Sequence, residues 1–473
     1  MSLDSHTVLL VNPWIYDFAA YDFWNKPLGL LTIGAILDRL GYEVQLIDCL
    51  DRFDPTLPPS TGRSDGSGKF HRERLEPPPD LRLIPRQYSR YGWPVQMVEE
   101  RLAQLPAPTA ILITSFMTYW YPAVADMVRL LRRFFPNTPV ILGGIYASLC
   151  PDHARAYVRP DHLIVGEGEE AAVHLVAQLC GGPGRDYRYA HLDELPPPLY
   201  EKYPVLHSAA LLTTRGCPYR CSFCASHLLT RGYRRRSVEH VVQEVLQWRE
   251  TRQVNQFAFF DDALLFQPEQ HCKPLLRRLI ELDLASHWHT PNGLQVRYLD
   301  AELARLMKAC GFATLRLSFE SVEPSQQQNK VSSAELEQAF AHLVDAGFAR
   351  EQIGVYVMMG MAGQTPEQVQ RSIDFVHRLG ARVNLASYSP IPGTTETAFA
   401  QEQGWWSENE DLALANNSLY PLWRKKYGFA LCQEIVNYAR SGNERLTAKR
   451  TQNGGIVKTL SSEGPPSRCK GDS

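Results

Sequence analysis

Short apolar segments alternate with amphipathic segments along the first 190 residues. Runs of aliphatic residues predict strands over residues 7–12, 43–48, 110–114, 140–143 and 162–165. Between the first two runs, apolar positions at helical spacing predict a helix that begins near Pro27 and ends before Gly41. Such alternation is typical of a parallel sheet covered by helices. We therefore expect an α/β chain whose residues 1–190 form a doubly wound, Rossmann-like domain.

The same alternation resumes after a proline-rich linker over residues 191–208. Strands are predicted over residues 209–213, 256–260, 289–292, 314–319, 354–359 and 382–387. Six strand and helix units fit a partial (β/α)6 barrel of the TIM type over residues 209–400. The chemistry of such a barrel is expected at the carboxyl ends of its strands.

Three segments lie outside this alternation. Residues 49–94 form an insertion rich in Pro, Gly, Ser and Arg, which is too long for an ordinary loop and could be a lid or a disordered segment. Residues 401–440 are expected to be helical. Residues 441–473 are polar and rich in Gly, Ser and Lys, so we expect disorder there.

Composition excludes several classes of function. The 473 residues are 44% hydrophobic and carry a formal net charge of only −2, which gives no general reason to bind nucleic acid. No apolar run approaches the ~18 residues of a spanning helix, so we expect no stable membrane insertion and a cytoplasmic location. Ten cysteines are too few for a disulfide scaffold, and three of them lie within eight residues. This grouping indicates a metal site.

The three grouped cysteines are Cys217, Cys221 and Cys224, in a C-x3-C-x2-C pattern directly after a predicted strand. Thiolates are the usual ligands of iron-sulfur clusters. Structural zinc is the main alternative, but no fourth ligand at matched spacing is evident nearby. Three unrelated buried thiols are the remaining alternative.

This loop resembles the signature of the radical S-adenosylmethionine (SAM) superfamily, and the resemblance spans about residues 209–399. It implies a 4Fe-4S cluster on the three cysteines, with one iron left open for the amino and carboxylate groups of SAM. An electron from the cluster would then cleave SAM and release a 5'-deoxyadenosyl radical. Phe223 matches the position that family members place near the adenine.

Further segments match the family in order, and the resemblance assigns their polar residues to SAM. Asp261 and Asp262 end a predicted strand, although acids there often cap the next helix. Arg316, Ser318 and Glu320 share one face of a strand, where they could instead pair with one another. Asn292 and Gly360 lie in family-like turns, which turn formation alone could also explain.

The first domain carries glycines and polar residues at the ends of its predicted strands, where doubly wound sheets bind ligands. Its segments together resemble the cobalamin-binding domain that precedes the barrel in one radical SAM subgroup. The expected cobalamin contacts are Asn12, Ser115, Met117, Gly143, Gly144, Tyr146, Gly166 and Glu167. The Asp-x-His-x-x-Gly signature is absent, because His153 and His162 stand at the wrong spacing. We therefore expect no protein histidine on cobalt.

These resemblances favour a cobalamin-dependent methyltransferase acting on an unactivated carbon of a small molecule or biosynthetic intermediate. The SAM methyl group is electrophilic, so such a carbon needs radical activation and a second methyl carrier. An enzyme that uses both cofactors for cyclisation or rearrangement is the alternative. A redox sensor is a distant third. It would not need residues that hold SAM, whereas this sequence carries them at Asp261, Arg316 and Glu320. The expected partners are a small-molecule substrate and an electron donor such as flavodoxin or ferredoxin.

Overall fold

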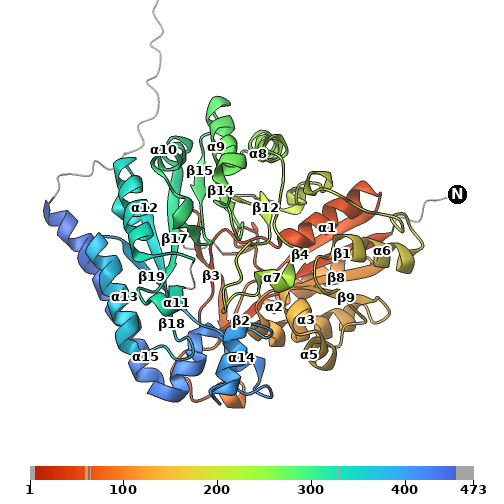
Figure 1. Cartoon of the computed structure of the whole chain (residues 1–473). Coiled ribbons are helices and arrows are strands. Elements are labelled where there is room, and N and C mark those ends of the chain that lie inside the picture. Colours follow the sequence, from red (N-terminus) through yellow and green to blue (C-terminus); the bar gives the residue numbers. More distant parts are fainter. Residues whose placement is uncertain (1–5, 59–61, 64, 328–329, 454–473) are drawn as a thin grey trace, which may run out of the picture.

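The computed structural model describes residues 6–58, 62–63, 65–327 and 330–453. Two parallel sheets organise this part of the chain (Figure 1). The first sheet lies in the N-terminal domain and the second in the barrel domain.

The first sheet has the order β10-β9-β8-β1-β4, and all its pairings are parallel. Its strands are β1 Thr7–Asn12, β4 Glu43–Asp48, β8 Ala110–Ser115, β9 Val140–Gly144 and β10 His162–Leu163. One face packs against α1 Leu28–Arg39 and α6 Glu169–Cys180, and the other against α2 Val95–Gln104 and α3 Tyr121–Phe134. Helices on both faces explain why the strands read as continuous apolar runs. The predicted doubly wound sheet is confirmed.

The second sheet runs β11-β14-β15-β17-β18-β19 and is the partial barrel expected from the sequence. Its strands are β11 Ala209–Leu211, β14 Gln256–Phe259, β15 His287–His289, β17 Phe312–Glu320, β18 Ile353–Met359 and β19 Arg382–Ser387, and β16 Leu294–Gln295 pairs with β17. Its outer helices are α8 Val238–Arg252, α9 Cys272–Glu281, α10 Ala301–Cys310, α12 Ser333–Asp345 and α13 Pro366–Leu379. The first predicted strand is shorter than expected, because the chain turns away after Leu211 into the short hairpin β12 Thr214–Arg215 and β13 Arg234–Arg235.

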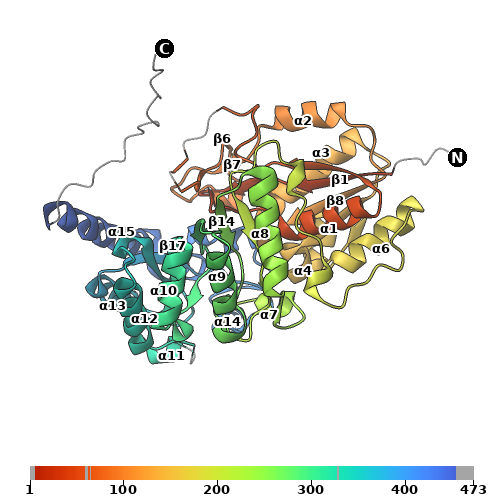
Figure 2. The ribbon, with the colours of Figure 1, turned by 90° about the horizontal axis from the view of Figure 1, so that it is seen from above.

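The insertion is largely ordered where the structure describes it. Three short antiparallel strands, β2 Ile15–Asp17, β6 Arg72–Arg74 and β7 Ser89–Tyr91, form one small sheet, and β3 Tyr21–Asp22 pairs with β5 Gly68–Lys69. Figures 1 and 2 place these strands between the first domain and the barrel. Of the two alternatives, disorder is therefore wrong for the described part of the insertion.

The C-terminal segment adds α14 Thr395–Glu402 and the long helix α15 Pro421–Asn453, which bends at Gly428. Helix α15 packs against α13 and β19. The disorder expected from residue 441 onward is thus wrong as far as Asn453, because this stretch continues a helix that is anchored to the barrel. Residues 454–473 lie outside the described part.

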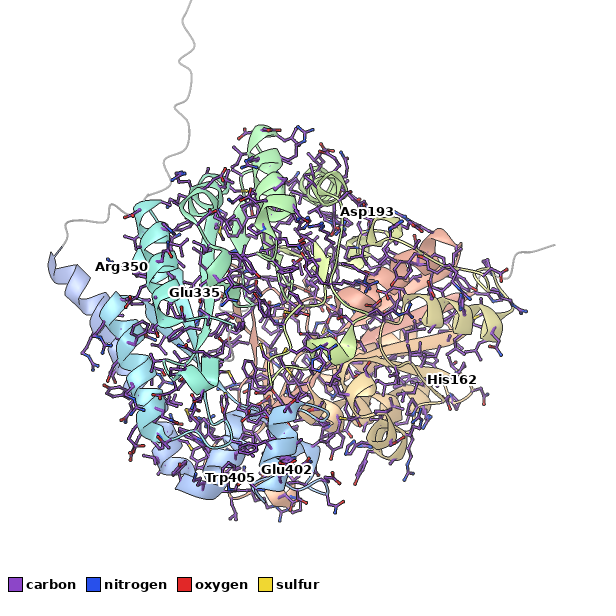
Figure 3. All side chains as sticks on the ribbon, in the orientation of Figure 1. His162, Asp193, Glu335, Arg350, Glu402 and Trp405 are labelled. Carbon is purple, nitrogen blue, oxygen red and sulfur yellow. The ribbon has the colours of Figure 1, made fainter. Side chains whose placement is uncertain are left out.

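The two domains share buried contacts. Leu31 of α1 belongs to the same apolar cluster as Tyr203 of the linker and the barrel core. The Tyr203 hydroxyl donates to Asp48 Oδ2 at 2.5 Å, at the end of β4. Asp193 of the linker accepts the N–H of Ser237 at the start of α8 (Figure 3). Trp24, which precedes α1, stacks on His289 of β15 with ring centroids 3.9 Å apart.

Within the described residues, no helix has both the length and the apolar character needed to span a bilayer.

Candidate active site

The three grouped cysteines lie on the loop between β12 and the short helix α7 Ser226–Leu229, at the carboxyl end of the first barrel strand. The loop begins at Gly216, whose φ of +78° lies in the left-handed region. A Cβ at this position would overlap the carbonyl oxygen of Gly232. Glycine therefore allows the loop to turn out of the hairpin.

The spacing of the sulfurs favours a group larger than one ion. Among the described residues, the one set of three potential ligands whose atoms all lie within 4.8 Å is Glu269, Asp300 and Glu302, and these acids bind the Lys273 ammonium. The sulfurs of Cys217, Cys221 and Cys224 are thus more widely spaced. Thiolates around a single zinc at Zn–S of about 2.3 Å would lie about 3.8 Å apart. As they stand, the three sulfurs therefore do not form the close set that a single zinc ion needs.

The cysteine thiols are half-buried. Burial raises the pKa of Cys221 to about 11, although the nearby Lys330 lowers it, and burial also raises the pKa of Cys217. Such thiols lose their protons when metal binds, because only thiolates act as ligands.

Glu396 fastens the cysteine loop to the far side of the barrel. Its Oε2 accepts the Ser222 hydroxyl at 3.0 Å, its backbone N–H donates to the Ser222 carbonyl at 2.9 Å, and its Oε1 accepts the N–H of Ala362 at 2.8 Å. Burial raises the pKa of this carboxyl. Glu396 lies in the first turn of a helix, and no sequence signal set it apart from other helix-start acids.

Asp261 and Asp262 end β14 and have different surroundings. Asp261 is buried, and its Oδ1 accepts the backbone N–H and hydroxyl groups of both Thr213 and Thr214 at 2.5–3.0 Å. Asp262 is exposed toward a cavity beside the cysteine loop. All four donors reach Oδ1, whereas the buried Oδ2 has no hydrogen-bond partner among the described residues, so the predicted contact of Asp261 with SAM stays a prediction. Asp262 is the acid that a ligand can reach.

Ser318 and Glu320 form a polar cluster at the end of β17 with Lys330, which the sequence analysis missed. Lys330 Nζ donates to Glu320 Oε1 at 2.8 Å and to Ser318 Oγ at 2.9 Å. The carboxylate of Glu320, together with the thiols of Cys221 and Cys217, raises the pKa of Lys330 against the effect of burial. Glu320 has a φ of +68°, a strained conformation for a residue other than glycine that is often found at functional sites.

Arg316 lies deeper along β17 than Ser318 and Glu320. Its side chain is near Tyr356, Arg382 and Asp65 of the insertion, and burial lowers its pKa. In the described part of the chain, Arg316 Nη1 donates to the Leu315 carbonyl at 3.3 Å and makes no hydrogen bond or ion pair with Lys330 or Glu320. Its role in SAM binding stays a prediction.

The remaining predicted SAM residues have structural contacts. Asn292 Nδ2 donates to the Phe260 carbonyl at 2.8 Å, so it ties β14 to the next turn. Gly360 has a φ of +92°, and its N–H donates to Gln364 Oε1 at 2.8 Å. Phe223 packs against an apolar cluster that includes Met361 and Tyr119. Roles of these three residues toward SAM stay predictions.

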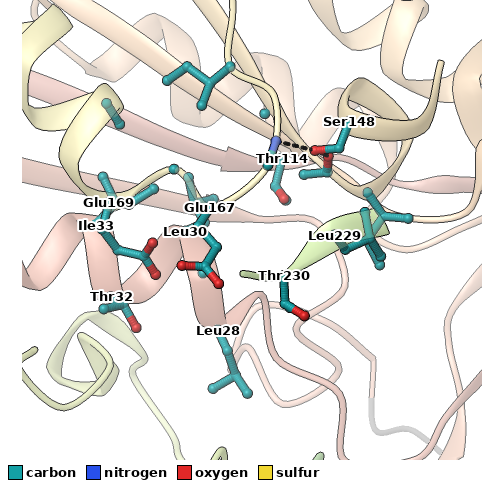
Figure 4. A pocket seen from close by; sticks show the side chains of 18 of the residues that line it. Leu28, Leu30, Thr32, Ile33, Thr114, Ser148, Glu167, Glu169, Leu229 and Thr230 are labelled. Carbon is teal, nitrogen blue, oxygen red and sulfur yellow. Dashed lines mark hydrogen bonds between the residues drawn. The ribbon is translucent and has the colours of Figure 1, made fainter. Parts of the chain in front are cut away.

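A cavity of about 310 Å³, which we call the glycine cavity, separates the first domain from the cysteine loop. Gly143, Gly144 and Gly166 line it on one side, and Gly216 and Asp262 on the other. Figure 4 shows Ser148, whose hydroxyl accepts the N–H of Gly166 at 2.9 Å, beside Thr114. A Cβ on Gly166 would meet nothing within 4 Å and would reduce the free space. The cavity is suited to a ligand that spans the two domains.

A second cavity of about 250 Å³, the aromatic cavity, adjoins the first at Thr114, which lines both. Asn12 lines it at the end of β1, where its amide donates to Asp48 Oδ1 at 2.7 Å. Phe116 and Met117 also line it and are 39% and 38% exposed, which leaves them free to cover a flat ligand. Asn12 and Met117 thus both line this cavity, and their contact with cobalamin stays a prediction.

Two predicted cobalamin contacts are instead buried by protein. Ser115 accepts the N–H of Ala147 and donates to the Gly143 carbonyl at 2.7 Å, so it supports the loop from beneath. Tyr146 is 0% exposed, and its hydroxyl bonds to His153 Nδ1 at 2.7 Å. Neither lines a cavity, and we correct their predicted role. The sequence around Ser115 and Tyr146 did not indicate whether their side chains point toward a ligand or into the protein.

No histidine occurs among the described residues that line the glycine and aromatic cavities. His153 is held by Tyr146, and His162 lies at the outer margin of the first domain (Figure 3). The lack of a protein histidine on cobalt stays a prediction.

Glu167 connects the first domain to the barrel. Its carboxylate pairs with Arg234 and accepts the N–H of Arg231 at 3.2 Å. The neighbouring Glu169 pairs with Arg215 at 2.5 Å, one residue before the cysteine loop. The strand-end loop of the first domain is thereby fixed against that loop.

Comparisons with known proteins agree with both domains. Residues 211–376 match the model of the Radical SAM superfamily, and residues 87–176 match that of the B12 binding domain. A radical SAM domain uses SAM and a 4Fe-4S cluster, and a B12-binding domain takes cobalamin. The cysteine spacing and the glycine-lined space between the domains fit these groups.

Three known proteins illustrate the similarity. A cytidylyl-2-hydroxyethylphosphonate methyltransferase from Streptomyces wedmorensis is 24% identical over 86% of this chain and 83% of its own. An anaerobic magnesium-protoporphyrin IX monomethyl ester cyclase from Rubrivivax gelatinosus is 24% identical over 62% and 59%. TsrM, a radical S-adenosylmethionine methyltransferase from Kitasatospora setae, is 20% identical and superposes with a TM-score of 0.60 over 84% and 76%. With both domains in one chain, the protein belongs to the radical SAM enzymes that carry an N-terminal cobalamin-binding domain.

Proposed function

We propose that this enzyme is a cobalamin-dependent methyltransferase that acts on an unactivated carbon of a small molecule or biosynthetic intermediate. The observation that carries the proposal is the position of the glycine cavity. It opens on one side to the strand ends of the first domain and on the other to Gly216 and Asp262 beside the cysteine loop. A cofactor held by the first domain therefore faces the place where SAM is cleaved.

When bound, the cluster and SAM supply a substrate radical, and cobalamin supplies the methyl group. The protein's own residues bind and orient these groups. Asp262 is placed to hold the SAM ammonium, and Lys330, oriented by Glu320 at 2.8 Å, to hold its carboxylate. Glu396 fixes the cysteine loop through Ser222. Phe116 and Met117 line the adjoining cavity, where apolar side chains exclude water.

The names of the relatives favour methyl transfer but also include its alternative. The Streptomyces relative, whose match covers most of both chains, is a methyltransferase. The Rubrivivax relative is a cyclase, and it keeps cyclisation without methyl transfer as the second candidate.

The fate of the SAM methyl group distinguishes these two activities. Anaerobically reconstituted holoenzyme is incubated with dithionite and SAM carrying a deuterated methyl group. Each SAM molecule that donates its methyl group becomes S-adenosylhomocysteine. For a methyltransferase we therefore expect both S-adenosylhomocysteine and 5'-deoxyadenosine. In the Cys221→Ala variant, 5'-deoxyadenosine should be lost, because one cluster ligand is missing.

Formation of 5'-deoxyadenosine with every labelled methyl group still on methionine would favour the cyclase alternative. An unchanged yield of 5'-deoxyadenosine in Cys221→Ala would contradict radical cleavage of SAM at a cluster held by these cysteines.

We further propose that the enzyme works in the cytoplasm with flavodoxin or ferredoxin as the electron donor. Cleavage of SAM needs a strong one-electron reductant. Every cysteine within the described residues is a free thiol, which is consistent with a reducing compartment.

A further inference from the structure

A third cavity, of about 310 Å³, lies between the insertion and residues 18–21 and has no role in the cofactor sites described above. Its wall combines the segment between β2 and β3 with the segment between β5 and β6. The two small antiparallel sheets bring these segments together, so the cavity forms only when the insertion is folded. We call it the basic cavity.

Four of its lining residues are basic: Arg52, Lys69, His71 and Arg72. None of the described lining residues is acidic. Arg52 pairs with Asp22 at 2.7 Å and is fixed by that contact. The side chains of Lys69 and His71 have no ion pair or hydrogen bond within the described part of the chain. An anion entering the cavity would therefore find donors that are not already satisfied.

Aromatic side chains make up much of the remaining wall. Phe70 and Tyr91 are buried, whereas Tyr21 is 42% exposed. Arg72 lies within hydrogen-bonding reach of the Tyr91 hydroxyl, which keeps a guanidinium beside the rings. Aromatic faces next to cationic donors suit a flat ring attached to an anionic group.

The basic cavity adjoins the aromatic cavity next to the proposed cobalamin site. Ala19, Ala20, Tyr21 and Phe70 line both of them. A ligand anchored at Lys69 could thus extend past Tyr21 toward the space at the ends of β1 and β8.

We propose that the basic cavity binds a phosphate-bearing aromatic group, of the kind found in a nucleoside monophosphate. Lys69, His71 and Arg72 hold the phosphoryl oxygens, and Tyr21 and Phe70 contact the ring. That this group belongs to the methyl acceptor rests on the proposed function, whereas the binding site itself does not.

Binding is tested by calorimetry on the cobalamin-loaded protein, so that cobalamin occupies its own site. The probe is uridine 5'-monophosphate, because an adenine nucleotide would also fit the SAM site. We expect saturable binding of the nucleotide. Uridine and inorganic phosphate, each lacking one half of the recognised group, should bind at least tenfold more weakly.

The double variant Lys69→Gln/Arg72→Gln should weaken nucleotide binding at least tenfold. Both side chains are exposed, so the fold should persist, and circular dichroism checks this. Arg82→Gln is the matched control, since Arg82 is an exposed arginine of the same insertion that does not line the cavity. This variant should keep the wild-type affinity.

Absence of saturable nucleotide binding, or equal affinity in the double variant and the wild type, would overturn the proposal. Uridine that binds as tightly as its monophosphate would do the same. Neither SAM nor a reductant is present, so these results are independent of whether the enzyme transfers methyl groups.

Discussion

Asp261 and Asp262 are adjacent acids at the end of β14, but their carboxylates have different environments. Asp261 accepts four donors from Thr213 and Thr214 and is enclosed by protein. Asp262 faces the glycine cavity beside the cysteine loop. The first residue therefore holds two strands together, and the second is available to a ligand.

Substituting each acid with alanine should separate stability from SAM binding. Asp261→Ala leaves four buried donors without their acceptor and should lower the free energy of unfolding by about 3 kcal/mol, measured by urea denaturation. Asp262→Ala should leave that free energy nearly unchanged. It should weaken SAM binding about 30-fold, or about 2 kcal/mol, in equilibrium dialysis of the reconstituted protein. The reverse pattern, with SAM binding dependent on Asp261, would contradict this assignment.

The same pair shows what the sequence could predict about the site. The cysteine pattern and the order of the motifs located the cluster loop, because those residues are close in the chain. The sequence could not tell which of two adjacent acids faces inward, since that depends on the hydroxyl groups of Thr213 and Thr214 from another strand. Lys330 was missed for a similar reason, because only folding brings it to Glu320.

At the level of elements, the turn between β9 and the short helix α4 Ile145–Leu149 depends on Gly144. Its φ of 96° and ψ of −169° are essentially restricted to glycine. A Cβ there would overlap the Ser115 carbonyl oxygen at the end of β8. This close approach of two strand ends forms one wall of the glycine cavity.

Gly144→Ala should destabilise this turn and reduce cobalamin uptake. We expect a loss of about 2 kcal/mol or more in the free energy of unfolding, from backbone strain together with the overlap. Gly143→Ala adds a Cβ to the same cavity without this overlap, since it meets only Ile164 at 4.0 Å, and it therefore measures the effect of lost space alone. Bound cobalamin is measured by its visible absorbance after desalting. Equal uptake by the two variants would show that the turn does not shape the site.

Strands with strong apolar runs were predicted well, and the insertion was not. Strands β1 and β4 have the predicted bounds because β1 is buried along its whole length and β4 keeps buried Val44, Ile47 and Asp48, which leaves a clear pattern in the sequence. The insertion strands are two or three residues long and include Arg72 and Lys69. Such short polar strands are stabilised by contacts with other segments. They leave no apolar pattern in the sequence, which therefore indicated an irregular segment.

For the whole molecule, the apolar core crosses the boundary between the domains. Leu31 of the first domain packs with Tyr203 and the barrel core, and Tyr203 also donates to Asp48. The ion pairs of Glu167 and Glu169 add further contacts near the cysteine loop. These contacts fix the first domain against the barrel.

The apoprotein should therefore unfold in one cooperative thermal transition. Separating the domains would expose Leu31 and Tyr203, and each fully buried apolar side chain of this size contributes about 1.5–3 kcal/mol. Differential scanning calorimetry measures the number of transitions. Two well-resolved transitions in the wild type would contradict a shared core. Leu31→Ala should lower the transition temperature, or begin to divide the transition in two.

The stack of Trp24 on His289 bears on how enzymes of this kind exchange parts during evolution. Trp24 precedes α1, and its indole donates to the Asp65 carbonyl of the insertion, yet its ring lies against a barrel strand. Recombination at the proline-rich linker would join a first domain to a barrel that never coevolved with that ring. Chimeras made at this junction should fold best when the residue facing Trp24 is transplanted together with the N-terminal half. The linker separates two domains in the sequence, but the residues that must change together include His289 of the barrel.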